Sequence, residues 1–548
     1  MRLPQSLAAA AFAASVALPP CSRTLAFCLS SSRLPSQRSA RGRASTSQQQ
    51  QPRSQHERHR QQHRRRPRST QLLPRMAFDP DVTPVALDAF HDWLTKSGVK
   101  IGDNAALAGR SPLAGGRGLV ATKPLENGQT VLAIPQSLGL TASELKSSGI
   151  ARHLAGYEGW TGDTGLIALQ VLWERSLGDK SKMAPWIEVL PAQGELDMPL
   201  FWNGEDLALA DASSTRGISG FGADVDEDYS WLNQNVFAKN PTVFPADKFG
   251  SDDFRWAMGV ALSRSFFVNG ELRLTPLVDF VNHSSSRATV EPTEGGSTGL
   301  FGSTAVVLRA GRNYEEGEEF LVSYGPKGAA GYLEENGFVP PVSGSQVTCE
   351  VEFTITEDDK FFDDKDDILT LQGLSTTATF DLTAVGLPDS ELVRFLRLRF
   401  VSGEDAFLLE GIFRNEVWDF MDEPVSRMNE AAVNEALATR CQDELKGFYG
   451  STKEDEDIMS GKLEATERQR LCASVRRGER LALQMTTNWC DTDSKALDRK
   501  EYYQERRLKD LQLDLPWEAS RFQHGGSGHL VDDIYPTERR PGGGELDW

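Results

Sequence analysis

The sequence predicts an α+β fold in which a domain of short strands and helices precedes a helical domain. Short β-like stretches bounded by Gly and Asn turns lie on both sides of a mainly helical insert at about 141–250. Beyond about residue 345 the chain changes to long, charged stretches with apolar residues at helical spacing. Polar, low-complexity segments at the two ends follow neither pattern.

These changes of composition divide the 548 residues into four segments, two of which are folded domains; as a soft prior this length suggests two to four domains. We expect a disordered targeting leader over 1–75, a first folded domain over 80–342, a helical domain over 345–515 and a disordered tail over 516–548. No run of about 18 apolar residues is present, so we expect neither a membrane-spanning helix nor a membrane partner. We also expect a monomer.

The leader is basic, whereas the rest of the chain is strongly acidic. Residues 1–75 hold 14 Arg, no Lys and one acid, and the remaining residues hold 45 basic and 77 acidic side chains, a net charge of −32. An acidic body repels phosphates, which disfavours a nucleic-acid partner. An apolar, Ala-rich start followed by Arg- and Ser-rich sequence is typical of a bipartite leader to a plastid. The alternative is a basic arm without an address, in a cytoplasmic protein.

The elements of the first domain follow from periodicity and turns. Leu87, Phe90 and Trp93 recur at helical spacing, which predicts an amphipathic helix over 84–97. Ser251, followed by two acids in the first turn, is expected to cap another helix. The other expected elements are strands over 118–122 and 130–134, mainly helical sequence over 141–210, a Gly/Asp/Ser-rich loop over 211–230, and strands over 274–280, 304–309 and 319–324.

The second domain is expected to be helical apart from a β-like stretch over 347–356. Asp389 is predicted to cap a helix that turns Leu392, Phe395 and Leu396 inward. Further polar stretches with apolar stripes predict helices over 427–449, 453–488 and 494–512. Packed against one another, such helices form a separate domain.

The first two candidate functional segments are a glycine-rich turn near the start of the first domain and an arginine near the end of the helix that begins near Ser251. Gly115-Gly116-Arg117 could let the backbone approach a ligand closely, although a plain turn at the start of a strand is the alternative. Arg264 lies near the end of an apolar helix, where an arginine can bind a ligand or pair with a structural carboxylate. Neither segment is specific by itself.

The other two candidate segments follow strands. Asp279, Asn282 and His283 lie within five residues after an apolar stretch, and Tyr324 ends a later strand. A metal site needs a larger ligand cluster than one Asp and one His, and the six scattered cysteines form no CxxC pair, so we expect no metal. The cysteines also favour a reducing compartment over a disulfide framework.

In this order and spacing the four segments resemble the SET domain of protein methyltransferases. The shared features are a Gly-x-Gly turn, Asp-x-x-Asn-His, Glu-x-x-x-x-x-Tyr-Gly and Asn-Gly-Phe-Val. The resemblance is to the RuBisCO large-subunit lysine methyltransferase class, whose SET domain is split by an insert and followed by a helical substrate-binding domain. It covers about 80–342 and, more loosely, the chain to about 500. It implies a SET-domain β-fold with a pseudoknot.

The resemblance also implies the activity, the cofactor and the roles of single residues. Tyr324 corresponds to the catalytic tyrosine, and Asp279 to a residue that lines the acceptor pocket. A protein substrate is implied to bind through the helical domain, with RuBisCO large subunit and aldolase as candidates. S-adenosyl-L-methionine is implied to bind at Gly115, Gly116, Arg117, Arg264, Asn282 and His283.

One position departs from the lysine-methylating members of the class. They usually carry Tyr before the Gly-Phe of the last motif, where this chain has Asn336. A changed acceptor pocket would make Asn336 a substrate-binding residue and would favour a histidine acceptor, as in the actin-histidine branch. Alternatively, Asn336 only ends a helix before Gly337. A SET-fold binding module without catalysis is the remaining alternative.

Overall fold

The computed structural model describes residues 84–102, 105–108, 117–154, 156–157, 161–210, 217–286, 290–298, 303–341, 344–411, 413 and 416–511. The chain divides into two compact units. The first runs to Cys349 and includes Thr383–Val385 and Glu444–Ala482; the second comprises Glu350–Leu382, Gly386–Asp443 and the residues from Leu483. The expected leader and tail lie outside the described residues.

The described strands of the first unit form one four-stranded sheet, in the order β1-β4-β9-β8, and the pairs β2-β3, β5-β6 and β7-β10. The strands predicted over 118–122, 130–134 and 304–309 are confirmed as β3, β4 and β9. The bounds are β1 Lys100–Ile101, β2 Ala105–Ala108, β3 Gly118–Ala121, β4 Thr130–Pro135, β5 Ser265–Val268, β6 Glu271–Leu274, β7 Asn282–His283, β8 Val290–Thr298, β9 Ser303–Ala310 and β10 Leu321–Val322.

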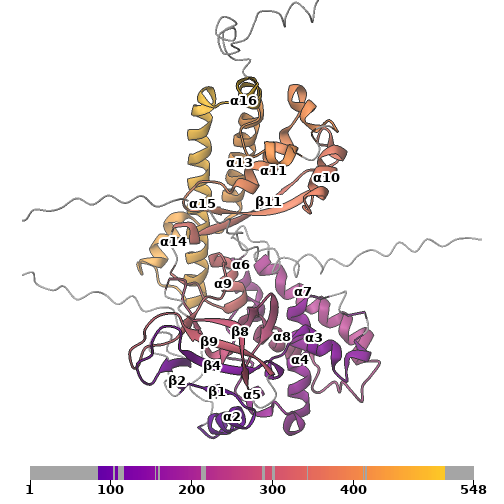
Figure 1. Ribbon diagram of the computed structural model, residues 1–548, viewed down its shortest axis with the longest axis vertical. Helices are drawn as coiled ribbons and strands as arrows, with labels where there is room; N and C mark the ends of the chain where they lie inside the picture. The colour runs from indigo at the N-terminus through magenta and orange to yellow at the C-terminus, as the bar shows by residue number, and fades with distance from the viewer. Residues whose placement is uncertain are drawn as a thin grey trace, which may run out of the picture. The chain divides into compact units, whose positions relative to one another are not determined.

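In the view of Figure 1, helices α3, α4, α7 and α8 lie to the right of the four-stranded sheet and α2 lies below it. The amphipathic helix predicted over 84–97 is confirmed as α2, with Phe90 and Leu94 buried. The bounds are α2 Pro84–Lys96, α3 Ala142–Ser147, α4 Asp163–Leu177, α5 Ala184–Ile187, α6 Gly204–Ala210, α7 Gly217–Leu232, α8 Ser251–Arg264, α9 Ala329–Asn336 and α14 Thr452–Met459; α15 Glu467–Ala496 begins in this unit.

The loop predicted over 211–230 is wrong for most of its length, because α7 occupies Gly217–Leu232. Its Val225 and Leu232 side chains are buried. Helix propensity is a weak preference, and burial of an apolar face outweighs the unfavourable glycines in this segment.

Helix α8 begins at the predicted position, but Ser251 is not its cap. Gly250 takes the N-cap position, and the Asp253 carboxylate accepts its backbone N–H over 3.3 Å. The apolar side chains of this helix are buried on all of its sides: Phe254, Trp256, Ala257, Met258, Val260, Ala261 and Leu262. A helix buried all round places its last residue, Arg264, in the interior of the unit.

The strand predicted over 274–280 is wrong. β6 ends at Leu274, and Val278–Phe280 forms a single 3₁₀ turn before the short strand β7. Pro276 lacks the N–H that a sheet ladder requires, and Leu277 adopts φ +68°, a strained conformation for a branched residue. Asp279 therefore projects from a turn and not from a strand.

β7 and β10 are parallel neighbours, with Asn282 opposite Leu321 and His283 opposite Val322. The strand predicted over 319–324 is thus present but shorter, since β10 holds two residues. This pairing joins two of the candidate segments recognised in the sequence. The pseudoknot implied by the resemblance stays a prediction.

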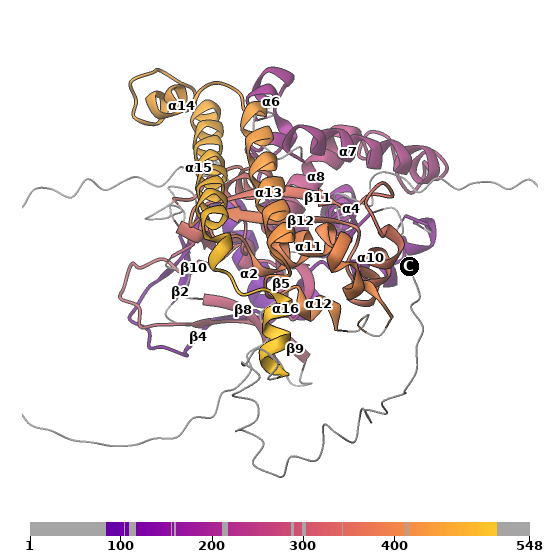
Figure 2. The same ribbon diagram turned by 90° about the horizontal axis from the view of Figure 1, so that it is seen from above.

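The second unit is mainly helical, but the expected all-α domain also contains the pair β11-β12 (Figure 2). Asp389 caps α11 as predicted by accepting the Glu391 N–H over 2.7 Å, and the three inward residues of α11 are buried. The stretch predicted over 453–488 is divided between α14 and α15. The bounds are β11 Thr348–Thr354, α10 Phe362–Leu371, β12 Thr377–Thr383, α11 Ser390–Phe400, α12 Val417–Phe420, α13 Arg427–Gly447 and α16 Tyr503–Asp510.

A buried ion-pair cluster in the first unit is formed by Asp455, Arg476 and Arg480. Asp455 is fully buried and accepts hydrogen bonds from Arg476, at 2.5 Å, and from Arg480. Arg480 also donates to the carbonyl oxygens of Tyr449 and Gly450, at 2.8 and 2.9 Å. Each of these groups is hydrogen-bonded to another group of the cluster. The cluster therefore holds the start of α14 against α15.

Candidate active site

Tyr324 follows β10 and lies in a cluster of aromatic rings. Its hydroxyl donates to the carbonyl oxygen of Val281 over 2.9 Å. Its ring meets those of Phe266 and Phe338 at steep angles, with centroids 5.5 and 6.2 Å away. Burial raises the pKa of Tyr324 above its ordinary value, so the hydroxyl stays protonated. It can donate a hydrogen bond and offer lone pairs, but it cannot serve as a base at neutral pH.

His283 lies beside Tyr324 as a neutral imidazole. Its Nδ1 accepts the backbone N–H of Tyr324 over 3.1 Å, and its Nε2 lies 2.8 Å from the Ser285 hydroxyl. The tautomer that satisfies both bonds carries its proton on Nε2. Burial, followed by the charge of Lys327, lowers the pKa of His283 to about 4. The imidazole thus positions the Tyr324 backbone without adding charge to the site.

Asn282 joins three segments that are distant in the sequence. Its amide nitrogen donates to the carbonyl oxygen of Arg117 over 2.9 Å and to Oε1 of Glu319 over 2.7 Å. All three residues are buried. Gly115 and Gly116, which precede Arg117, lie outside the described residues. The side chain of Asn282 therefore holds the end of the glycine segment beside β7 and β10.

Arg117, Arg264 and Asp279 bring three buried charges together. Nη1 of Arg264 donates to the backbone carbonyl of Asp279 over 2.6 Å, and the Trp186 indole donates to Oδ2 of Asp279 over 3.2 Å. The Arg117 guanidinium lies over the Phe280 ring, 4.7 Å from its centroid. Burial, and then repulsion by Arg264, lowers the pKa of Arg117 to about 10. Both arginines remain cations at neutral pH.

One oxygen of this cluster fits a ligand. Oδ1 of Asp279 is buried and accepts no hydrogen bond from the described residues. A buried carboxylate oxygen without a partner is stabilised by binding a hydrogen-bond donor, and a charged ammonium group forms a strong hydrogen bond to a carboxylate. Both S-adenosylmethionine and a lysine acceptor carry an amino group, so the residues present fit a site for these molecules.

A carboxylate held in this environment should make stability depend on pH. Burial, opposed by Arg264, raises the pKa of Asp279 from 3.8 to about 6. Its contribution is therefore fully present below pH 4 and is lost as the pH rises through 6. We expect the unfolding free energy of Asp279→Asn, relative to wild type, to increase by about 2 kcal/mol between pH 4 and 7. Urea denaturation at both pH values measures the change.

Asp88→Asn, at an exposed position of α2, controls for the loss of a surface carboxylate. An Asp279→Asn difference from wild type that is equal at pH 4 and 7 would contradict this account of the Asp279 environment. Titration of His283 is common to wild type and variant, so it cancels in the comparison.

Asn336 is the last residue of α9, and its side chain contacts the end of α8. Its amide donates to the Ser263 carbonyl over 3.3 Å and accepts from Lys327 over 3.4 Å. Gly337 takes φ +74°, where an added Cβ would lie 2.5 Å from the Asp197 carbonyl oxygen. Asn336 thus ends a helix, and its partner Ser263 precedes Arg264 in the site. Its role in substrate binding stays a prediction.

Sequence reasoning missed three residues of the site. Glu319 carries the buried carboxylate that Asn282 binds, whereas the motif acid Glu318 pairs with Arg312 at the surface over 2.8 Å. Trp186 comes from the insert, and only the fold places it on Asp279. The ring of Tyr332 packs against that of His283 at a tilt of 45°, with centroids 4.7 Å apart. Its position four residues before Asn336, on the same helical face, was the available signal.

None of the helices described combines the length and apolar character that crossing a bilayer requires. The four cysteines of the described residues, Cys349, Cys441, Cys472 and Cys490, are buried and free.

Two segments of the chain match models of known protein families. Residues 116–325 match the SET domain model, and residues 356–483 match the model "Rubisco LSMT substrate-binding". The chain is 31% identical over 446 residues to the chloroplastic ribulose-1,5-bisphosphate carboxylase/oxygenase large subunit N-methyltransferase of Nicotiana tabacum, covering 79% of this chain and 87% of the relative. It is 32% identical to the chloroplastic [fructose-bisphosphate aldolase]-lysine N-methyltransferase of Arabidopsis thaliana, covering 77% and 87%.

A solved structure shows the same fold. The crystal structure of the SET domain of LSMT bound to lysine and AdoHcy superposes with a TM-score of 0.70 at 28% identity, covering 81% of this chain and 100% of that one. The likeness thus spans both matched segments and not the SET motifs alone.

Proposed function

Because the chain belongs to the SET-domain protein-lysine N-methyltransferases of the RuBisCO large-subunit class, we propose that it methylates a lysine of a plastid protein with S-adenosylmethionine as methyl donor. RuBisCO large subunit and aldolase are the first acceptors to test, since two relatives are named for them. The chloroplastic names of these relatives and the composition of residues 1–75 support the plastid. We expect a monomer without a nucleic-acid or membrane partner.

The observation that carries this proposal is the placement of Tyr324. Its protonated hydroxyl donates to the carbonyl oxygen of Val281 over 2.9 Å, and Val281 immediately precedes Asn282 and His283 in the sequence. In this assignment Tyr324 is the catalytic residue, and its hydroxyl and the neighbouring carbonyl oxygens line the path of the methyl group. Oxygen lone pairs in such a ring attract the polarised C–H bonds of a methyl group that leaves a sulfonium.

The other residues of the site are assigned to binding and orienting the cofactor. Arg117, Arg264, Asn282 and His283 are assigned to the cofactor, which supplies an activated methyl group when bound. The two arginines offer positive charge to its carboxylate, while Asn282 fixes the Arg117 peptide and His283 fixes the Tyr324 peptide. Alignment of donor and acceptor supplies much of the reduction of the barrier in such reactions.

The acceptor lysine must lose its proton before it attacks. Tyr324 cannot take that proton, because burial raises its pKa and the hydroxyl is already a donor to Val281. Asp279 carries a buried carboxylate whose Oδ1 accepts no hydrogen bond from the described residues, and we assign it to binding the amino group of the acceptor. Desolvation in the pocket lowers the pKa of an amine, so release of the proton to water suffices.

Transfer of tritiated methyl groups tests the proposal. We expect the full chain to label RuBisCO holoenzyme or aldolase, and a plastid extract more than a cytosolic one. Acid hydrolysis of the labelled band should release methyl-lysine. Methyl-histidine would instead establish the histidine acceptor suggested by Asn336. Cofactor binding by calorimetry without label in any protein would leave the non-catalytic binding module.

A further inference from the structure

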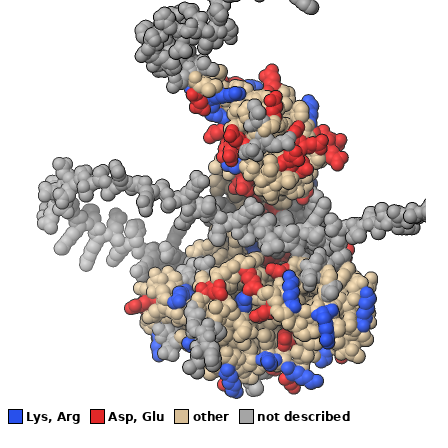
Figure 3. Space-filling view, turned by 45° about the vertical axis from the view of Figure 1, so that its right-hand side comes forward, with Lys and Arg blue, Asp and Glu red and all other residues tan. Residues whose placement is uncertain are grey.

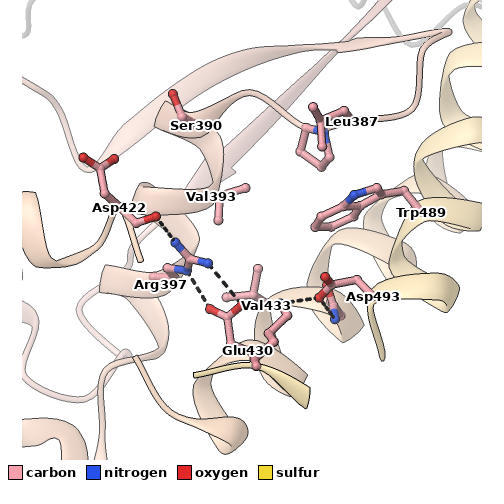
Figure 4. A pocket seen from close by; sticks show the side chains of 12 residues that line it. Leu387, Ser390, Val393, Arg397, Asp422, Glu430, Val433, Trp489 and Asp493 are labelled. Atoms are coloured by element: carbon pink, nitrogen blue, oxygen red, sulfur yellow. Dashed lines mark hydrogen bonds and ion pairs between the residues drawn. The ribbon is translucent and has the colours of Figure 1, made fainter. Parts of the chain in front are cut away.

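The second unit contains a pocket of about 250 Å³ between α11, α13 and the end of α15 (Figure 4). This volume is below the roughly 300–1,000 Å³ of sites that bury a drug-sized ligand, so it suits a single side chain. Its walls are Leu387, Pro388, Ser390, Val393, Arg397, Asp422, Glu430, Val433, Asn434, Trp489, Asp493 and Lys500.

The cations at the bottom of the pocket are already engaged. Arg397 forms a bidentate ion pair with Glu430, with N–O distances of 2.6 and 3.1 Å. It also donates hydrogen bonds to the carbonyl oxygens of Met421 and Asp422. Lys500 lies 2.6 Å from both Glu430 and Asp493. An incoming anion would have to displace these internal carboxylates, at a high desolvation cost.

The acceptor groups of the pocket retain free capacity. Oδ2 of Asp493 accepts from Lys500 and from Asn434, whereas Oδ1 has no hydrogen-bond partner among the described residues. Trp489 precedes Asp493 by one helical turn, so both face the pocket from one side of α15 (Figure 4). An aromatic face beside an open carboxylate oxygen attracts an ammonium or guanidinium group.

An exposed apolar residue, Leu387, lies beside Trp489 at the rim of the pocket (Figure 4). Leu387 is 64% exposed. Gly386 permits this placement: it takes φ +84°, and an added Cβ would lie 2.8 Å from the Met485 carbonyl oxygen on α15. The loop can therefore approach α15 closely and present Leu387 to the aliphatic stem of a bound side chain.

The surrounding charge favours the same ligand. Residues 350–382, 386–443 and 483–511 hold 28 acidic and 14 basic side chains. Figure 3 shows acidic side chains gathered on the surface of the second unit. A surface of this sign attracts a basic segment of a partner and repels an acidic one.

We propose that this pocket is a docking site for a lysine or arginine side chain of the acceptor protein, separate from the lysine that is methylated. The inference rests on the proposed function, because the occupant belongs to the protein substrate. The guanidinium or ammonium group would meet Asp493 and the Trp489 ring, and the aliphatic stem would meet Leu387. The pocket then contributes to the affinity for the protein and not to the chemical step.

Steady-state kinetics of the full chain on RuBisCO holoenzyme and aldolase test the docking site. We expect Trp489→Ala to raise the KM for the protein acceptor about tenfold, the loss of one aromatic anchor, with kcat and the S-adenosylmethionine Kd unchanged. Trp489→Phe, which keeps an aromatic face, should recover most of the affinity. Asp493→Asn should raise the KM several-fold and weaken its dependence on salt.

Two matched variants control for these changes. Asp491→Asn alters an exposed carboxylate of the same helix that does not line the pocket, and Leu371→Ala removes an exposed apolar side chain from α10. Both should keep the wild-type KM. Variants at Trp489 and Asp493 that also keep it would overturn the proposal and leave the methyltransferase assignment intact.

A binding measurement separates the docking site from catalysis. Calorimetry with a hexa-arginine peptide should show weaker binding to Trp489→Ala and Asp493→Asn than to wild type and the controls. If wild type methylates no acceptor but this difference persists, the proposed function fails while the cation pocket stands. Binding of a hexa-glutamate peptide that depends on Trp489 would show an anion site and overturn the inference.

Discussion

Tyr324→Phe should lower the rate of methyl transfer by about two to three orders of magnitude, the cost typical of removing one preorganised polar group from a transition state. The ring and its contacts with Phe266 and Phe338 remain, and only the hydroxyl that donates to Val281 is lost. Single-turnover transfer from tritiated S-adenosylmethionine measures the rate of the chemical step. Calorimetry should show cofactor affinity within a few-fold of wild type.

Tyr332→Phe is the matched control for this experiment. Tyr332 belongs to the same aromatic cluster, but its hydroxyl donates to the Gly325 carbonyl over 2.7 Å. We expect its loss to cost about 1 kcal/mol of stability and less than a several-fold change in rate. Equal losses of rate in the two variants would refute a special role for the Tyr324 hydroxyl and indicate general damage to the cluster.

Asn282→Ala should destabilise the first unit and weaken cofactor binding together. The change removes the hydrogen bonds to Arg117 and Glu319 and leaves two buried acceptors without this donor, which costs roughly 2–4 kcal/mol. The Arg117 peptide then loses its anchor beside β7. We expect the urea midpoint to fall and the Kd for S-adenosylmethionine to rise about tenfold, which corresponds to about 1.4 kcal/mol.

Two further variants test whether loss of the Asn282 hydrogen bonds causes the changes in stability and cofactor affinity. Asn127→Ala, in the exposed turn before β4, should change neither quantity. Asn282→Asp keeps the shape but sets a second carboxylate beside Glu319, where the two favour sharing a proton. Its stability should therefore recover as the pH falls. An Asn282→Ala protein with a wild-type midpoint and wild-type cofactor affinity would show that the anchor does not matter.

Local signals predicted the elements whose cause is local. The helix over 84–97 and the cap at Asp389 depend on periodicity and on one side chain bound within two residues, so the sequence alone sufficed. The loop over 211–230 was wrong because glycine content is local, whereas the burial that forms α7 comes from the rest of the unit. The strand over 274–280 was wrong because hydrophobicity concealed the turn at Pro276 and Leu277.

By itself, the sequence determined the family, the residue types of the site and their spacing, since Asp279-x-x-Asn282-His283 and Tyr324 are ordered along the chain. Only the tertiary structure decided their partners. Asn282 meets Glu319 and Arg117, which are 37 and 165 residues away, and Asp279 meets Trp186, which is 93 residues away. The fold also decided the charge states of Asp279 and His283, because desolvation depends on what surrounds a group and no local sequence specifies that.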